Sequence, residues 1–196
     1  MNLKFNKFWK IKETKNKGKG LFAAKEISKG TIIGDYLGFI LRPEDAIVDE
    51  ENIYLMYYSD SAVISPNFKK PGIYLLNHSC VPNCFLYIYK NHTLIFALFD
   101  IKKNEELTIP YLLPPKDKFC RPCKHICKCG NLRCVGTMHL SKKIYSKWRK
   151  FSDIKNKKIK EEKIKYGKEL PKLNKYPEKI SETYIREIKN IFNYVL

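Results

Sequence analysis

The sequence contains no long hydrophobic run and no apolar segment near its start. No stretch approaches the roughly 18 apolar residues that a membrane-spanning helix requires, so we expect no contact with a membrane. The first twenty residues also lack the apolar core of a secretory signal peptide. We therefore expect a protein of a reducing intracellular compartment, where disulfides are rare.

Acidic residues are scarce relative to basic ones. The chain has 20 Asp and Glu against 38 Lys and Arg, a formal net charge of +18, and its lysines crowd after about residue 140. An excess of this size favours a polyanionic partner such as nucleic acid. The alternative is a compositional bias toward lysine that leaves only a solvated coat.

The seven cysteines are an odd number, so they cannot all pair with one another. In a reducing compartment they are better interpreted as metal ligands or free thiols. Cys127, Cys129 and Cys134 lie within eight residues, with Gly130 allowing a tight turn. A structural zinc takes four ligands in a tetrahedron, so this spacing predicts a zinc whose fourth ligand comes from elsewhere. Three buried free thiols are the alternative.

The chain length of 196 residues suits one domain with an appendage, and a hydrophobic fraction of 44% allows a real core. Many short apolar runs separated by turn residues predict a body of short strands up to about residue 113. Residues 85–101 predict a hairpin with Asn91 and His92 at its turn. Prolines and cysteines over residues 114–123 mark a linker.

Beyond residue 140 the pattern changes. Apolar residues at three- and four-residue spacing predict a helix over residues 141–170, broken by Pro171 and Pro177. A second helix is predicted over residues 181–196, with Ser181 as its N-cap. Strands followed by helices make the predicted fold class α+β.

Three segments of the strand-rich part could belong to a functional site, but none of them identifies a function on its own. The residues from Asn77 to Cys84 read Asn-His-Ser-Cys-Val-Pro-Asn-Cys, which alone is compatible with a cap and a rigid turn. The Gly18-Lys19-Gly20 turn would let the backbone approach a ligand closely, but any tight turn looks the same. Tyr111 ends the segment that begins at Glu105, and a lone Tyr at a strand end is usually core packing.

In this order, however, the segments resemble the SET-domain lysine methyltransferases. In that family a GxG turn is followed by Glu-Tyr-x-Gly, an aromatic run, the NHSCxPNC signature, a strand carrying the catalytic Tyr, and a CxCxxxxC post-SET module. The matching segments here are Gly18–Gly20, Asp35–Gly38, Tyr54–Met56, Asn77–Cys84, Glu105–Tyr111 and Cys127–Cys134.

The resemblance implies a SET fold of several small, mostly antiparallel sheets with a knot-like NHSC segment. It also implies a zinc-binding post-SET loop, followed here by a helical C-terminal extension. The corresponding division is a SET domain over residues 1–113, a linker and post-SET zinc module over 114–139, and a lysine-rich extension over 140–196.

The resemblance also implies S-adenosyl-L-methionine as cofactor, Zn²⁺ as metal, and a role for each matching residue. The expected catalytic residues are Tyr111 and Tyr54. The residues expected to bind the cofactor are Lys17, Gly18, Lys19, Gly20, Tyr54, Asn77, His78 and Tyr111. The expected zinc ligands are Cys80, Cys127, Cys129 and Cys134.

The other cysteines fall outside this pattern. Cys120 and Cys123, together with His125, offer an alternative ligand set. Cys84 is interpreted as a packed free thiol.

Some positions depart from the family pattern. Tyr74 lies in the stretch where the family often has Arg-Phe, so a cationic contact to the cofactor is missing, and the lysines flanking Gly18 would have to supply it. Pro110 replaces the usual Asp before the catalytic Tyr; since Pro cannot donate a backbone hydrogen bond, we expect an irregular strand end. Leu86 and Ile109 are apolar where an extra phenol would stop the reaction early, which favours di- or trimethylation.

The expected function is therefore transfer of a methyl group to a lysine of a protein, by default a histone tail, in the nucleus. For a protein of a virus or an intracellular pathogen this would be the host nucleus, and a cytoplasmic location is the alternative. The basic extension predicts a contact with nucleosomal DNA, or else only packs on the SET body. One alternative is a catalytically weak SET-like zinc module that binds nucleic acid or protein. Another is a zinc-ribbon nucleic-acid binder with an unrelated body.

Overall fold

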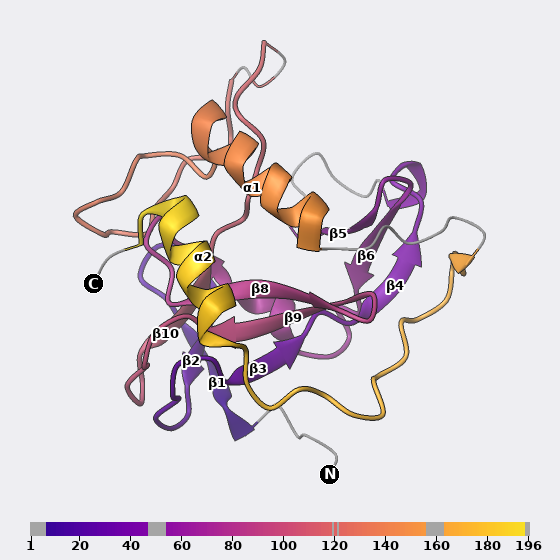
Figure 1. Ribbon diagram of the computed structural model, residues 1–196, viewed down its shortest axis with the longest axis horizontal. Coiled ribbons are helices and arrows are strands. Elements are labelled where there is room, and N and C mark those ends of the chain that lie inside the picture. Colours follow the sequence, from indigo (N-terminus) through magenta and orange to yellow (C-terminus); the bar gives the residue numbers. More distant parts are fainter. Residues whose placement is uncertain (1–6, 47–53, 119, 121, 156–162, 195–196) are drawn as a thin grey trace.

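The computed structural model describes residues 7–46, 54–118, 120, 122–155 and 163–194 (Figure 1). Short strands fill the part of the chain before residue 110, and the two α-helices of the described residues follow after residue 140, so the prediction of an α+β fold is confirmed. The strands are β1 (Trp9–Glu13), β2 (Lys19–Ala23), β3 (Ile32–Asp35), β4 (Gly38–Leu41), β5 (Met56–Ser59), β6 (Ala62–Pro66), β7 (Asn77–His78), β8 (Cys84–Tyr89), β9 (His92–Ala97) and β10 (Glu106–Ile109). The helices are α1 (Lys142–Lys155) and α2 (Glu182–Phe192), with 3-10 turns at Glu44–Ala46 and Ile73–Leu75.

The strands form three small sheets, in the orders β1-β2-β10-β7, β3-β9-β8 and β4-β6-β5. All pairings between these strands are antiparallel except that of β7 with β10. Strand β9 is buried along its whole length, because it lies between β3 and β8 and is covered on its faces. None of the helices in the described residues is long and apolar enough to cross a membrane.

The predicted hairpin over residues 85–101 is present, but its turn is displaced by one residue. Lys90 and Asn91 both have positive φ, 48° and 65°, and Tyr89 pairs with His92. Two left-handed residues make the tight turn that suits the twist of a hairpin. The prediction of His92 as a turn residue was wrong because its side chain is buried, with Nδ1 at 2.8 Å from a carboxylate oxygen of Asp35.

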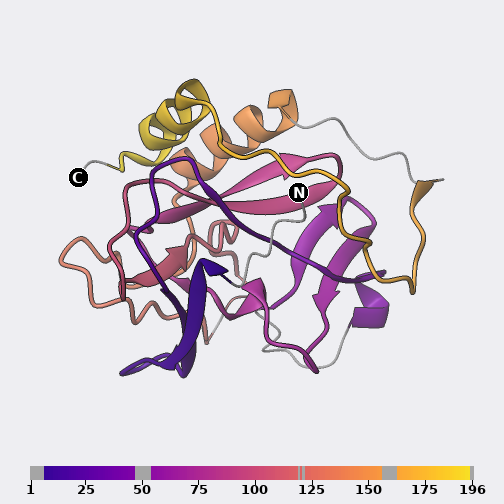
Figure 2. The same ribbon diagram turned by 90° about the horizontal axis from the view of Figure 1, so that it is seen from below.

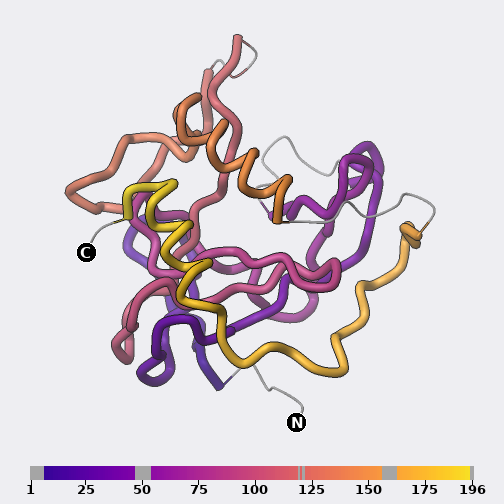
Figure 3. Tube along the Cα trace, viewed as in Figure 1, coloured from indigo at the N-terminus to yellow at the C-terminus, as the bar shows by residue number. Residues whose placement is uncertain are grey.

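The helix predicted over residues 141–170 is shorter than expected. Helix α1 ends at Lys155, residues 156–162 lie outside the described part, and residues 164–170 are not helical. Instead, Leu170 donates its N–H to the carbonyl of Gly38, and Ile40 exchanges backbone hydrogen bonds with Gly167 and Lys168. These bonds to the edge of β4 replace those of a helix. Figure 3 shows this segment running along the side of the body toward α2.

The second helix is confirmed together with its N-cap, but it ends at Phe192 and not at residue 196, because Asn193 takes a left-handed conformation with φ 55°. The hydroxyl of Ser181 accepts a hydrogen bond from the backbone N–H of Tyr184. The apolar face of α2, which includes Ile185, Ile188 and Phe192, is buried in one cluster with Phe85 and other residues of β8 and β9. Figure 2 shows both helices on the same side of this hairpin. The extension therefore packs on the sheet, as one of the two sequence interpretations expected.

A buried polar contact fixes the extension to the body as well. Tyr176, from the segment before α2, donates its hydroxyl to Asp35 of β3 at 2.8 Å, and the same oxygen contacts His92. All three residues are at most 8% exposed. Removing one donor from a buried carboxylate leaves that group poorly satisfied, which costs about 1–3 kcal/mol.

We therefore expect Tyr176→Phe to lower the free energy of unfolding in urea by about 1–3 kcal/mol. Tyr57→Phe is the matched control, because it also removes a phenol bonded to an aspartate, Asp60, but at a site that is 54% exposed. The control should change stability by less than about 0.5 kcal/mol. Equal stabilities for both variants would contradict an integral role for this contact.

Candidate active site and metal centre

The parallel pairing of β7 with β10 brings two distant segments together. Asn77 pairs with Thr108 and His78 with Ile109, and the N–H of the next residue, Ser79, donates to the carbonyl of Ile109 at 3.0 Å. This register sets Tyr111 against His78. The N–H of Tyr111 donates to Nδ1 of His78 at 3.2 Å, and the two ring centroids are 5.3 Å apart.

The imidazole of His78 is an acceptor in this arrangement. Burial, and then the nearby charge of Lys17, lower the pKa of His78 to about 4. The ring is therefore neutral near pH 7, with an unprotonated Nδ1 that can receive the Tyr111 N–H. This contact holds the backbone at the end of β10 in place, although β10 itself stops at Ile109, before Pro110, as the sequence indicated.

The glycine turn at the start of β2 contacts Asn77, in the same region as His78 and Tyr111. Gly18 has φ +67°, a conformation that favours glycine. A Cβ on Gly20 would lie only 2.7 Å from the side-chain amide nitrogen of Asn77, so glycine lets this side chain reach the backbone of the turn. The Asn77 amide donates to the carbonyl of Lys19 at 3.2 Å and to Glu106 at 3.0 Å. The turn, β7 and β10 thus share one polar cluster.

The two lysines flanking Gly18 lie differently from each other. Lys17 forms an ion pair with Glu106 at 2.8 Å, and both side chains are largely buried. Lys19 is exposed and contributes its backbone carbonyl to Asn77. The positive charge of Lys17 is therefore partly neutralised by Glu106, a residue to which the sequence interpretation gave no role.

The hydroxyl of Tyr111 has a defined orientation. It donates to the carbonyl of Leu76 at 3.2 Å, so its oxygen lone pairs are free to accept a hydrogen bond from another group. Burial, and then the neighbouring Tyr54, raise the pKa of Tyr111 well above its usual value. The group is a neutral phenol throughout the physiological range.

Two further tyrosines, Tyr36 and Tyr54, lie close enough to Tyr111 to interact with it electrostatically. The rings of Tyr54, Phe68 and Tyr74 contact one another edge to face, with centroids 5.4–5.8 Å apart. Tyr36 donates its hydroxyl to the carbonyl of Tyr54. Burial, and then Tyr111, raise the pKa of Tyr36. We call Tyr36, Tyr54, Phe68, Tyr74 and Tyr111 the aromatic cluster.

Sequence reasoning missed part of this cluster. Tyr36 lies between β3 and β4, in the Asp35–Gly38 segment that was matched to the family, but a buried Tyr is normally core, so no signal marked it. Phe68 lies in a loop rich in Pro and Lys and carried no signal either. Tyr74, which was noted only for replacing a basic residue, contributes its ring to the cluster instead.

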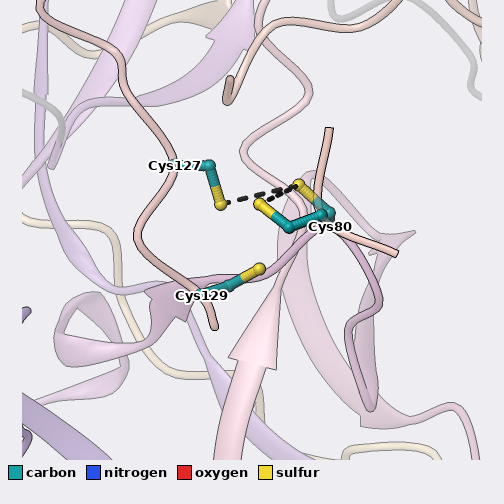
Figure 4. A group of neighbouring side chains, drawn as sticks. Cys80, Cys127 and Cys129 are labelled. Atoms are coloured by element: carbon teal, nitrogen blue, oxygen red, sulfur yellow. Dashed lines mark hydrogen bonds between the residues drawn. The ribbon is translucent and has the colours of Figure 1, made fainter. Parts of the chain in front are cut away.

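Four cysteine sulfurs converge next to this region. The Sγ atoms of Cys80, Cys127, Cys129 and Cys134 all lie within 4.8 Å of one another. The Sγ of Cys80 is 3.5 Å from that of Cys127 and 3.8 Å from that of Cys134. Figure 4 shows the labelled side chains pointing toward one another.

This arrangement fits zinc. Tetrahedral zinc with Zn–S bonds of about 2.3 Å places its sulfurs about 3.8 Å apart, which is close to the 3.5 and 3.8 Å found from Cys80 to Cys127 and Cys134. Cys80 is the last residue of the NHSC segment, two residues after β7, whereas the other three thiols come from the post-SET loop, so an ion here would tie that loop to β7. Cys84, by contrast, is fully buried beside β10, and burial raises the pKa of its thiol.

The comparisons with known proteins agree with the site. The family described as SET domain matches residues 18–112. Residues 18–112 are a SET domain. The small antiparallel sheets and the cysteine cluster beyond them are those expected of a SET fold with a post-SET zinc module.

Several similar proteins are histone-lysine methyltransferases by name. The histone-lysine N-methyltransferase trithorax of Drosophila virilis is 31% identical over 128 residues, which are 60% of this chain and 3% of that protein. The human histone-lysine N-methyltransferase 2B is 32% identical over 128 residues, 60% of this chain and 5% of that protein. The H3 lysine-4 specific histone-lysine N-methyltransferase of Neurospora crassa is 35% identical over 137 residues, 61% and 10% respectively. The chain thus spans a small fraction of the length of these relatives.

Replacing one thiol tests the metal centre. We expect Cys129→Ser to lower the zinc content by about one ion per chain, measured by mass spectrometry of the purified protein, because a structural zinc requires its four ligands. Cys84→Ala, which removes a thiol outside the cluster, should keep the zinc content of the wild type. Unchanged zinc in Cys129→Ser would contradict the four-thiol site.

Proposed function

We propose that this chain is a protein-lysine N-methyltransferase that moves a methyl group from S-adenosyl-L-methionine to a lysine side chain, with a histone as substrate. One observation carries the proposal: the Gly18–Gly20 turn, Asn77 with His78, and Tyr111 converge at one place beside an aromatic cluster. The relatives named as histone-lysine methyltransferases support the choice of substrate.

The polar cluster is the proposed cofactor site. The backbone at Gly18 is open to a ligand, because nothing lies within 4 Å of where a Cβ would stand, and Gly20 and Asn77 lie in contact beside it. The neutral ring of His78 lies beside these groups in the proposed cofactor site and holds the backbone of Tyr111 through a hydrogen bond. Lys17 and Lys19 are the cations available to a carboxylate, and Lys17 would have to share its charge with Glu106. When bound, S-adenosyl-L-methionine supplies a methyl group on a sulfonium, which is already an activated electrophile.

The aromatic cluster is the proposed lysine channel. A free lysine has a pKa of about 10.4, so most of the amine is protonated at neutral pH and cannot attack. Apolar walls formed by Tyr54, Phe68 and Tyr74 lower that pKa, because burial disfavours the charged form. The oxygen of Tyr111 then accepts a hydrogen bond from the neutral amine and aligns it. Alignment of this kind accounts for much of the rate in a transfer that needs no strong base.

The number of methyl groups depends on the space around the amine. Leu86 and Ile109 are apolar, and Tyr36 has its proton directed at the carbonyl of Tyr54. These features favour a product with two or three methyl groups.

The decisive variant is Tyr111→Phe. We expect it to lower kcat on a histone peptide by about 10²-fold or more, because a misaligned amine loses that much rate, while S-adenosyl-L-methionine binding by calorimetry changes little. Tyr57→Phe, at an exposed phenol, should keep full activity. Mass spectra of the product report the number of methyl groups in the same assay. Turnover at the wild-type level in Tyr111→Phe would remove the proposed role.

The pH dependence of the methylation rate shows whether the phenol of Tyr111 only aligns the amine or also acts as a base. Since the pKa of Tyr111 is raised, the residue does not ionise below about pH 10. The rate should rise with pH as the substrate amine loses its proton, and the profile of Tyr111→Phe should have the same shape at a lower level. An ionisation present in the wild type and missing in Tyr111→Phe would mean that Tyr111 acts as a base.

The same calorimetry tests the second candidate function. A catalytically weak SET-like zinc module would hold nucleic acid or protein without the cofactor, and Tyr74 and Pro110, which depart from the family pattern, favour it. If the wild type showed no S-adenosyl-L-methionine binding, this second function would replace the first.

We also propose a contact with nucleosomal DNA in the nucleus, made by α1. This helix has no buried residue, and Lys143, Lys147 and Lys150 are exposed at spacings that put them on one face. Such a row suits the phosphate backbone of DNA.

Replacing the three lysines by alanine should weaken methylation of nucleosomes and leave methylation of the free histone peptide unchanged. The loss should shrink at high salt, because phosphate contacts release counterions. Lys102, Lys103 and Lys172 are exposed elsewhere, and their triple alanine variant removes the same charge. Equal effects of both triple variants would mean that net charge, and not α1, attracts the nucleosome.

A further inference from the structure

A second group of metal-binding side chains lies apart from the four thiols. One ligand atom from each of Cys120, Cys123, His125 and His139 falls within 4.8 Å of the others. None of these residues belongs to the four-thiol group, and His139 carried no signal in the sequence because it follows the nearest of the others by fourteen residues. The sequence interpretation treated the first three as an alternative to the post-SET ligands, but the structure separates the two sets.

The separations match a tetrahedron around one zinc ion. Zn–N bonds of about 2.05 Å and Zn–S bonds of about 2.3 Å imply edges of roughly 3.3 Å between two nitrogens and 3.6 Å between nitrogen and sulfur. His139 Nε2 is 3.2 Å from His125 Nδ1 and 3.3 Å from the Sγ of Cys120, which is itself 3.9 Å from His125 Nδ1.

The tautomer of His139 favours a ligand role. Its Nδ1 is 2.6 Å from the carbonyl of Pro114, and since a carbonyl only accepts, Nδ1 carries the proton. Nε2 then directs its lone pair into the group. Metal-binding histidines usually have their second nitrogen held by a carbonyl or carboxylate in this way. The backbone of this residue is paired with Leu113, which fixes the ring further.

A hydrogen bond from His125 to His139 would explain one of these contacts without a metal, but it would not draw two thiols to the same point. Packing does not explain the convergence either. Among the described residues between 114 and 139, only Cys127 is buried, while Ile126, Leu132 and Val135 are 58%, 104% and 70% exposed. A segment without a core needs metal ions or other cross-links to hold one conformation.

We propose that Cys120, Cys123, His125 and His139 bind a second structural zinc, distinct from the one held by the four thiols. This ion joins the segment that leaves Tyr111 through Leu113 and Pro114 to the residues that enter α1. It adds no step to the methyl transfer.

X-ray absorption at the zinc edge, together with zinc content, tests the proposal on the wild-type chain. Two occupied sites give about two zinc ions per chain, with three sulfur and one nitrogen ligands per zinc on average. One zinc with four sulfurs would overturn the second site. One zinc with two sulfurs and two nitrogens would keep it and remove the four-thiol site instead, so the two failures are distinguishable.

Variants add an independent check. His125→Ala with His139→Ala should leave one zinc per chain in an all-sulfur environment. Cys127→Ser with Cys129→Ser should leave one zinc with equal numbers of sulfur and nitrogen ligands. Lys128→Ala, an exposed neighbour in the same segment, should keep the wild-type spectrum. A histidine variant with wild-type zinc content and spectrum would contradict the proposal.

Discussion

The parallel pairing of β7 with β10 is the constraint on which the site depends. Parallel neighbours cannot be joined by a tight turn, and here the chain between them forms the β8–β9 hairpin of another sheet. The packing of that hairpin therefore sets where β10 returns beside β7. A slip of one residue would move each of these two side chains, Asn77 and His78, to the other face of the sheet. The contact of Asn77 with the glycine turn and that of His78 with Tyr111 would then both be lost.

The C-terminal extension contributes to this constraint from the other side. Strand β9 is buried along its length, and α2 shares one apolar cluster with β8 and β9. Tyr176 adds a buried hydrogen bond to Asp35 of β3. The hairpin that positions β10 is therefore held between a second strand and a helix that lies more than 80 residues further along the chain. The basic character of the extension concerns its solvent face and not this packing.

Motif residues were predictable from the sequence because their spacing in the chain reflects one local structure each. The NHSC strand end, the glycine turn and the capped α2 are examples of this kind. Tyr36, Phe68 and His139 were not predictable, because their roles come from partners far away in the sequence. Residues 164–170 have a helical apolar pattern, yet they form hydrogen bonds with β4. An available sheet edge overrode local propensity, which is only a weak influence on structure.

The end of β10 shows how the fold and the metal sites act on the same few residues. Leu112 has φ 55°, a left-handed conformation that costs a branched residue about 1–2 kcal/mol. It persists because both neighbours are fixed. Tyr111 is held by His78 and Leu76, and Leu113 by its pairing with His139. The zinc ions proposed on His139 and on Cys80 would clamp the segments on both sides of this strained residue. Metal ligation would then add to the hydrogen bonds with His78 and Leu76 that hold Tyr111 in place.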